Sequence, residues 1–276
     1  MNKKQVYKWS ILISVFLSIL GVLALYYLFS SEMRESLIQI EGAWFVLIII
    51  LIRIGVLSGM TFYIFRQWFN QEQQYLSDIP FLFGLFFIVL TFGKALDILI
   101  NFTYYTLDDA ETFLILLKIR HFVIVLTLIP MLFLSIEMIL FVRSLKETRE
   151  NLKGEKYRDK LRIRIIILIL VVEFIVVALY PNTTVAGIVM AIIIIPSLIA
   201  IVWMFYFAYK NRRLSQVHPL ILSIGFGMYL ISQIIRPLVQ NIIGESAMYI
   251  IISEIVDLII FINIFIGFIM KVKYSD

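Results

Sequence analysis

The chain has 276 residues, of which 62% are hydrophobic, and its mean hydropathy is +0.98. Soluble domains are nearer half apolar, so this composition is typical of a membrane protein. The absence of cysteine excludes disulfides, thiol catalysis and cysteine-ligated metals, and two histidines exclude a histidine-rich metal site. The abundance of Ile and Lys fits an AT-rich prokaryotic genome, and the net charge of +5 is explained by the links between the apolar runs.

The apolar residues are gathered in long runs, and a bilayer core about 30 Å thick needs roughly 20 of them per helix. Hydropathy predicts an all-α, polytopic membrane helix bundle with eight transmembrane helices. The predicted spans are Trp9–Ser30, Ala43–Phe65, Ile79–Phe102, Ile119–Phe141, Ile163–Tyr180, Val185–Tyr209, Pro219–Gln240 and Met248–Met270.

The opening "MNKKQVYKW" and the apolar run after it resemble a signal sequence. The run is about as long as a full span, and no small-x-small cleavage site closes it, so we interpret it as a retained first helix. The alternative is a cleaved signal peptide that leaves seven spans.

The links between the predicted spans alternate in charge. The N-terminal segment, the fourth and sixth links and the C-terminal segment are basic, whereas the first and third links, "SEMRESLIQIEG" and "TLDDAET", are mainly acidic. The positive-inside rule then places both termini in the cytoplasm, in a multi-pass protein of the cytoplasmic membrane. Anionic lipid headgroups at the cytoplasmic face are the partner that these bases predict, and nucleic-acid binding is not needed.

The fourth link, Arg143–Arg164, carries nine Lys or Arg residues against four acids. It is rich in helix formers and is predicted to extend the fourth helix and to re-enter the membrane after Gly154. It is either a docking site for a protein partner or a solvated hairpin that faces lipid headgroups. We treat residues 1–276 as one membrane domain, with halves 1–142 and 162–276 joined by the link 143–161.

A four-plus-four internal repeat is suggested by two segments. "IPFLFGLFFIVLTFGKALDILIN" begins at Ile79, and "HPLILSIGFGMYLISQIIRPLVQ" begins at His218. Aligning their prolines places Lys94 on Gln233 and Asp97 on Arg236. Transporters and channels are often built from such halves.

Ionisable residues inside predicted spans are the candidate functional residues, because a charge at the bilayer centre costs about 2.5–3.5 kcal/mol on insertion scales. Three helices each carry a polar pair at i,i+3 spacing, which places both members on one face. The pairs are Lys94 with Asp97, Gln233 with Arg236, and Glu254 with Asp257. All fall in the outer halves of their helices, which predicts a shared ligand- or ion-binding chamber with Arg236 facing the acids of the last helix.

The alternative is that these groups form buried salt bridges that fix helix packing, with Lys94 reaching toward headgroups. Four further residues are candidates for pairing or a proton relay. Arg53 and Glu173 lie near mid-depth and could pair, His121 lies at the outer edge, and Glu137 lies nearer the cytoplasm.

Motifs for metalloproteases, serine hydrolases, P-loops and dinucleotide binding are absent from the sequence, and a cofactor is left unknown. Gly225 and Gly227 are predicted to be helix-packing positions. The leading hypothesis is a small transporter or ion-translocating protein without enzymatic activity. The alternatives are a sensory or scaffolding subunit that signals through a cytoplasmic partner, and an intramembrane hydrolase that uses Asp97 with Asp257.

Overall fold

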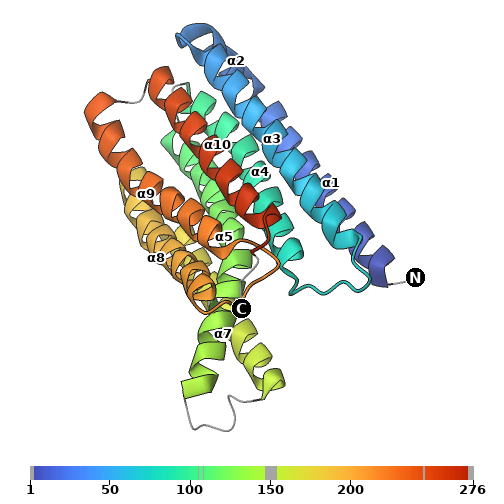
Figure 1. Ribbon diagram of the computed structural model, residues 1–276. Coiled ribbons are helices and arrows are strands. Elements are labelled where there is room, and N and C mark those ends of the chain that lie inside the picture. Colours follow the sequence, from blue (N-terminus) through green and yellow to red (C-terminus); the bar gives the residue numbers. More distant parts are fainter. Residues whose placement is uncertain (1–2, 105, 108, 147–153, 245, 273–276) are drawn as a thin grey trace. The chain divides into compact units, whose positions relative to one another are not determined.

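The computed structural model describes residues 3–104, 106–107, 109–146, 154–244 and 246–272, and within these ranges every regular element is a helix (Figure 1). The predicted all-α class is confirmed. The helices are α1 (Lys3–Leu28), α2 (Ser30–Gln39), α3 (Ala43–Phe69), α4 (Ile79–Thr103), α5 (Ala110–Lys146), α7 (Glu155–Leu179), α8 (Thr183–Lys210), α9 (Pro219–Ile243) and α10 (Ala247–Ile269).

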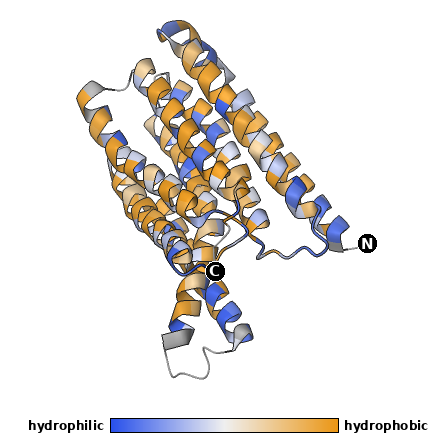
Figure 2. Ribbon diagram, viewed as in Figure 1, coloured by the Kyte–Doolittle hydropathy of each residue, from blue (hydrophilic) through white to orange (hydrophobic). Residues whose placement is uncertain are grey.

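Seven of the described helices are long and apolar enough to cross a membrane, and they contain seven of the eight predicted spans to within two residues at the ends of α1 and α10. Apolar residues cover these helices on several sides, as expected where lipid rather than water surrounds a helix (Figure 2). The chain is therefore a multi-pass membrane protein that contacts the bilayer. The remaining predicted span, Ile163–Tyr180, lies in α7. Its apolar stretch is interrupted by Arg162, Arg164 and Glu173.

Helical structure also forms outside the predicted spans. The first predicted link forms α2, and its buried Ser36 donates a hydrogen bond to the carbonyl of Phe102 in α4. Helix α5 begins nine residues before the predicted Ile119, because the Asp109 carboxylate accepts bonds from the backbone N–H groups of Glu111 and Thr112 at 3.1 and 3.3 Å. The Thr112 hydroxyl donates to the same carboxylate and lowers the pKa of Asp109.

The chain divides into two compact units, Met1–Thr127 and Leu128–Asp276, whose boundary lies within α5. In the first unit, α3 packs most extensively on α4, while α1 and α2 contact α4 through smaller surfaces. In the second unit, α8 packs on α9 and α9 packs on α10. The later part of α5 packs on α7 through Ile136, Leu140 and Ile166. The predicted halves, divided by the link 143–161, stay a prediction.

Close contact between α9 and α10 depends on two glycines. A Cβ atom on Gly225 would lie 2.7 Å from Cγ1 of Ile264, and one on Gly267 would lie 2.9 Å from the backbone nitrogen of Leu222. Gly225 is therefore a helix-packing position, as predicted. The same prediction is wrong for Gly227, where a Cβ atom would meet nothing within 4 Å.

Candidate functional site

The first cluster of charges, in unit one, joins α4 to α5. Lys94 Nζ lies 2.6 Å from Asp97 Oδ2, and Arg120 Nη2 donates to the same oxygen at 3.1 Å. The Nε of Arg120 donates to the other carboxylate oxygen, so that the guanidinium binds Asp97 through two groups. Gly93 leaves room for this arginine, because a Cβ atom there would lie 3.3 Å from Arg120 Nη1.

This arrangement confirms that Lys94 and Asp97 share one helix face. Lys94 is buried, with 5% of its surface exposed, so the proposed reach toward headgroups is wrong. Its ammonium group is directed at Asp97 instead, because a charge in a low-dielectric interior needs a counter-charge. The cluster combines two cations with one anion. His121, which follows Arg120 in α5, is also buried.

The second cluster, in unit two, joins α9 to α10. Arg236 forms an ion pair with Asp257, donates from Nε to the Ser232 hydroxyl at 3.2 Å, and donates from Nη2 to the Ser253 carbonyl at 3.1 Å. Tyr249 donates its hydroxyl to the Arg236 carbonyl at 3.1 Å. The predicted proximity of Arg236 to an acid of the last helix is confirmed at Asp257.

A groove of about 470 Å³ opens beside this second cluster. Its walls are apolar side chains of α9 and α10, including Ile231, Ile235 and Ile252, and its polar members are Ser232, Ser253, Tyr249 and Arg236. The two partners of the ion pair differ in access. The Arg236 side chain is 24% exposed and lines the groove, whereas the Asp257 side chain is 2% exposed. The positive member of the pair therefore faces the groove, and the negative member lies behind it.

Two other members of the predicted chamber lie in the same unit. Glu254 is buried on α10, one helical turn before Asp257, and Gln233 is half-buried on α9. The structure thus brings Lys94 to Asp97 and Arg236 to Asp257. The predicted chamber that joins residues of α4 to those of α9 and α10 stays a prediction.

Of the remaining candidates, Glu137 has a defined partner. Arg162 Nη1 lies 2.6 Å from the Glu137 carboxylate, its Nη2 lies 3.0 Å from Asp159, and its guanidinium carbon lies 4.0 Å from the centroid of the Phe133 ring. Glu137 therefore takes part in packing α5 on α7. Arg53 is buried in α3 and Glu173 is half-buried in α7, and their mutual pairing stays a prediction.

The sequence did not single out three residues of these clusters. Arg120 lies at the edge of the predicted span Ile119–Phe141, where a basic side chain is expected to face solvent. Ser232 and Tyr249 are common in membrane helices and carry no charge that would draw attention. One local signal could have found Ser232, because it precedes Arg236 by four residues and so lies on the same helix face.

Asp97 and Asp257, the pair considered for hydrolysis, are each bound to an arginine. Within the described residues, no group of three or more His, Cys, Asp or Glu side chains could hold a metal ion. No protein family, curated protein or solved structure matches this chain.

Proposed function

We propose that this protein is a small transporter or ion-translocating protein of the cytoplasmic membrane, and that the groove around Arg236 binds an anionic group of its solute. The observation that carries the proposal is the unequal exposure of the Arg236–Asp257 pair. A guanidinium that lines an apolar groove, with its counter-ion buried behind it, offers a strong donor to an incoming anion.

Three further contacts support a binding role for Arg236. Asp257, Ser232 and the Ser253 carbonyl hold the guanidinium in one orientation, so that little side-chain entropy remains to be lost on binding. Most other residues of the groove walls are apolar, which strengthens a charge interaction by excluding water. In this proposal Asp257 and the buried Glu254 exchange a proton or a cation as the solute moves.

The proposal includes eight membrane crossings, with α7 as the fifth and both termini in the cytoplasm. It also includes the four-plus-four repeat. Asp97 of α4 and Arg236 of α9, which the alignment makes equivalent, each form an ion pair with the helix that follows, at Arg120 and Asp257 respectively. In the first unit the earlier helix carries the acid and the following helix the base, and in the second unit this order is reversed.

Transport is tested in liposomes that contain this protein alone. Electrical currents on a solid-supported membrane are recorded after concentration jumps of inorganic phosphate, acetate and citrate, with and without a pH gradient. We expect an anion-dependent current in the wild-type protein that is lost in Arg236→Gln and partly kept in Arg236→Lys. Lys210→Gln, which removes an exposed base from the end of α8, is the matched control. A wild-type protein that moves none of these ions, or an Arg236→Gln variant that moves them normally, contradicts the proposal.

A sensory or scaffolding subunit is the second candidate, and the described ends of the basic link favour it. Lys156 and Lys160 are exposed on α7, where a cytoplasmic partner could reach them, whereas Arg162 of the same link is held by Glu137. This candidate predicts no flux, together with co-purification of a protein that is lost in the double variant Lys156→Gln, Lys160→Gln.

A further inference from the structure

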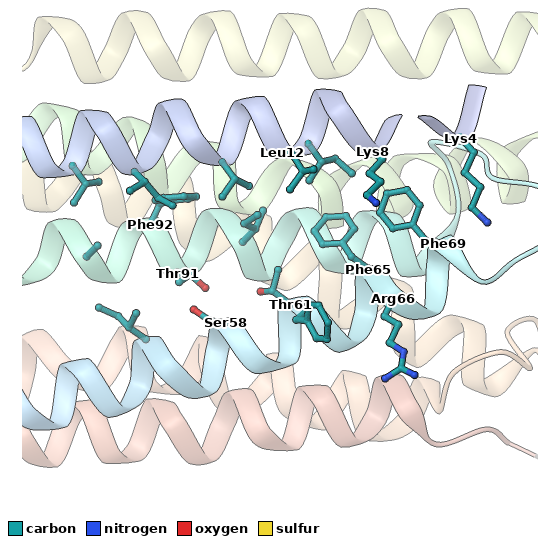
Figure 3. A pocket seen from close by; sticks show the side chains of 18 of the residues that line it. Lys4, Lys8, Leu12, Ser58, Thr61, Phe65, Arg66, Phe69, Thr91 and Phe92 are labelled. Atoms are coloured by element: carbon teal, nitrogen blue, oxygen red, sulfur yellow. The ribbon is translucent and has the colours of Figure 1, made fainter. Parts of the chain in front are cut away.

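A second groove lies in unit one, between α1 and the paired helices α3 and α4, and its volume is about 870 Å³ (Figure 3). It is lined mostly by aliphatic and aromatic side chains, such as Leu12, Phe65 and Phe92. The hydroxyls of Ser58, Thr61 and Thr91 point into it. No residue of the proposed transport site contributes to this groove.

The groove exists because α1 is attached near its two ends. Near the N-terminal end, the Tyr7 ring lies 5.8 Å from the Trp68 ring, centroid to centroid. Near the other end, the Tyr26 hydroxyl donates to the carbonyl of Ala95 in α4. Between these contacts no residue of α1 is buried. The stretch of α1 from Lys8 to Leu23 is about 22 Å long. It is longer than the hydrocarbon layer of one leaflet, which is about 15 Å thick.

The charged residues of the groove lie at one end. Lys4 and Lys8 of α1 and Arg66 of α3 line the end where the first residues of α1 approach the last turns of α3, and the Arg66 guanidinium extends away from the two lysines (Figure 3). They are the charged members of the lining, which includes no acidic residue. Among the described ion pairs, none involves these three bases. An occupant that complements this groove has a long apolar body and an anionic group at one end.

We infer that this groove binds an anionic phospholipid, with an acyl chain between α1 and the α3–α4 pair and the phosphate at Lys4 and Lys8, while Arg66 adds positive charge at the same end of the groove. The predicted orientation supports this occupant, because it places these bases at the cytoplasmic leaflet, where anionic lipids attract basic segments. The apolar lining excludes a soluble anion as the main occupant, since it leaves most of the groove without a polar partner.

The test is lipid binding by native mass spectrometry of the full chain. The purified protein in mild detergent receives equal amounts of phosphatidylglycerol and phosphatidylcholine with identical acyl chains. We expect the wild-type protein to retain phosphatidylglycerol preferentially. The triple variant Lys4→Gln, Lys8→Gln, Arg66→Gln loses the preference, by about fivefold for each base removed. The control variant Lys156→Gln, Lys160→Gln, Lys210→Gln removes the same amount of charge from exposed positions, and we expect it to keep the preference for phosphatidylglycerol.

A steric variant tests the apolar part independently. Ser58→Phe places a ring in the groove between α1 and the α3–α4 pair, and it reduces adducts of both lipids without changing a charge. If the triple variant does not fold, the wild-type protein is measured at increasing salt concentration, and its preference for phosphatidylglycerol must disappear. Equimolar inorganic phosphate must not displace the lipid. Equal retention of the two lipids by the wild-type protein overturns the inference. It is also overturned if the control variant loses the preference for phosphatidylglycerol as much as the triple variant does. A protein dimer without bound lipid also overturns it, because a second copy then covers α1.

Discussion

At the scale of single residues, the two ion pairs use the same chemistry with different access to the surroundings. Asp97 accepts hydrogen bonds from both Lys94 and Arg120, so its carboxylate is surrounded by cations. Arg236 keeps about a quarter of its side chain exposed to a groove. The first pair has the geometry of a structural contact between α4 and α5, and the second has that of a contact that can also accept a ligand.

Asp97→Asn is expected to destabilise the protein strongly. The amide cannot balance two cations. Removing one partner of a buried ion pair typically costs about 3–5 kcal/mol, and because 18% of the Asp97 side chain is exposed, a cost at the lower end of that range is expected. Thermal unfolding of the detergent-solubilised variant should show a clearly lowered midpoint. Glu72→Gln, at an exposed acid in the link after α3, is the control and should unfold like the wild type. Identical midpoints for the two variants would show that the Asp97 carboxylate does not hold α4 and α5 together.

Tyr249→Phe removes the hydroxyl that binds the Arg236 carbonyl at 3.1 Å. One such hydrogen bond contributes about 0.5–1.5 kcal/mol, so a small decrease in thermal stability is expected. The control is Tyr27→Phe, since Tyr27 is 81% exposed on α1. If the Tyr249 variant also alters the anion-dependent current, the hydroxyl positions Arg236 as well as stabilising α10. A midpoint equal to that of Tyr27→Phe would rule out the stabilising contact.

At the scale of helices, the closeness of packing varies greatly along the chain. Helices α9 and α10 approach each other at Gly225 and Gly267, and the His218 backbone nitrogen donates to the Gly267 carbonyl at 2.8 Å. Helix α1, by contrast, has no buried residue among those described. A tightly packed pair can hold an ion pair in a fixed geometry, whereas a loosely attached helix leaves space for lipid.

Gly267→Ala is expected to push α10 away from α9. The added methyl group would lie 2.9 Å from the Leu222 backbone nitrogen, which cannot move aside as a side chain can, and such overpacking costs about 1–3 kcal/mol. Gly227→Ala is the matched change in open space, and it should be neutral or stabilise by about 0.5–1 kcal/mol. Thermal unfolding compares the two variants. Equal effects would contradict the close approach of α9 and α10 at Gly267.

At the scale of the whole molecule, α7 decides the number of membrane crossings. Its apolar stretch contains three charges, whereas each of the seven apolar helices has an 18-residue stretch with at most two, but Arg162 is compensated by Glu137 and Asp159. An even number of crossings is also required if both termini are cytoplasmic. Every link after α7 changes sides if this helix does not cross.

Labelling of single cysteines decides the topology, and the chain has no native cysteine to interfere. With eight crossings, a membrane-impermeant maleimide added to intact cells should label Pro181→Cys, before α8, and spare Ser215→Cys, between α8 and α9. Ser31→Cys, in α2, is the control and should be labelled in either topology. The reverse pattern at the first two positions would mean that α7 lies on one side of the membrane.

The sequence by itself determined the all-α class and the positions of the apolar helices, because hydropathy and helical period are local properties. It also placed Lys94 and Asp97 on one face, since i,i+3 spacing fixes that relation within a helix. Only the tertiary structure decided that Arg120 is the partner of Asp97 and that Asp257 forms an ion pair with Arg236. It also decided where the two grooves lie. These features depend on how neighbouring helices rotate and how closely they approach, and that depends on shape complementarity between segments distant in sequence.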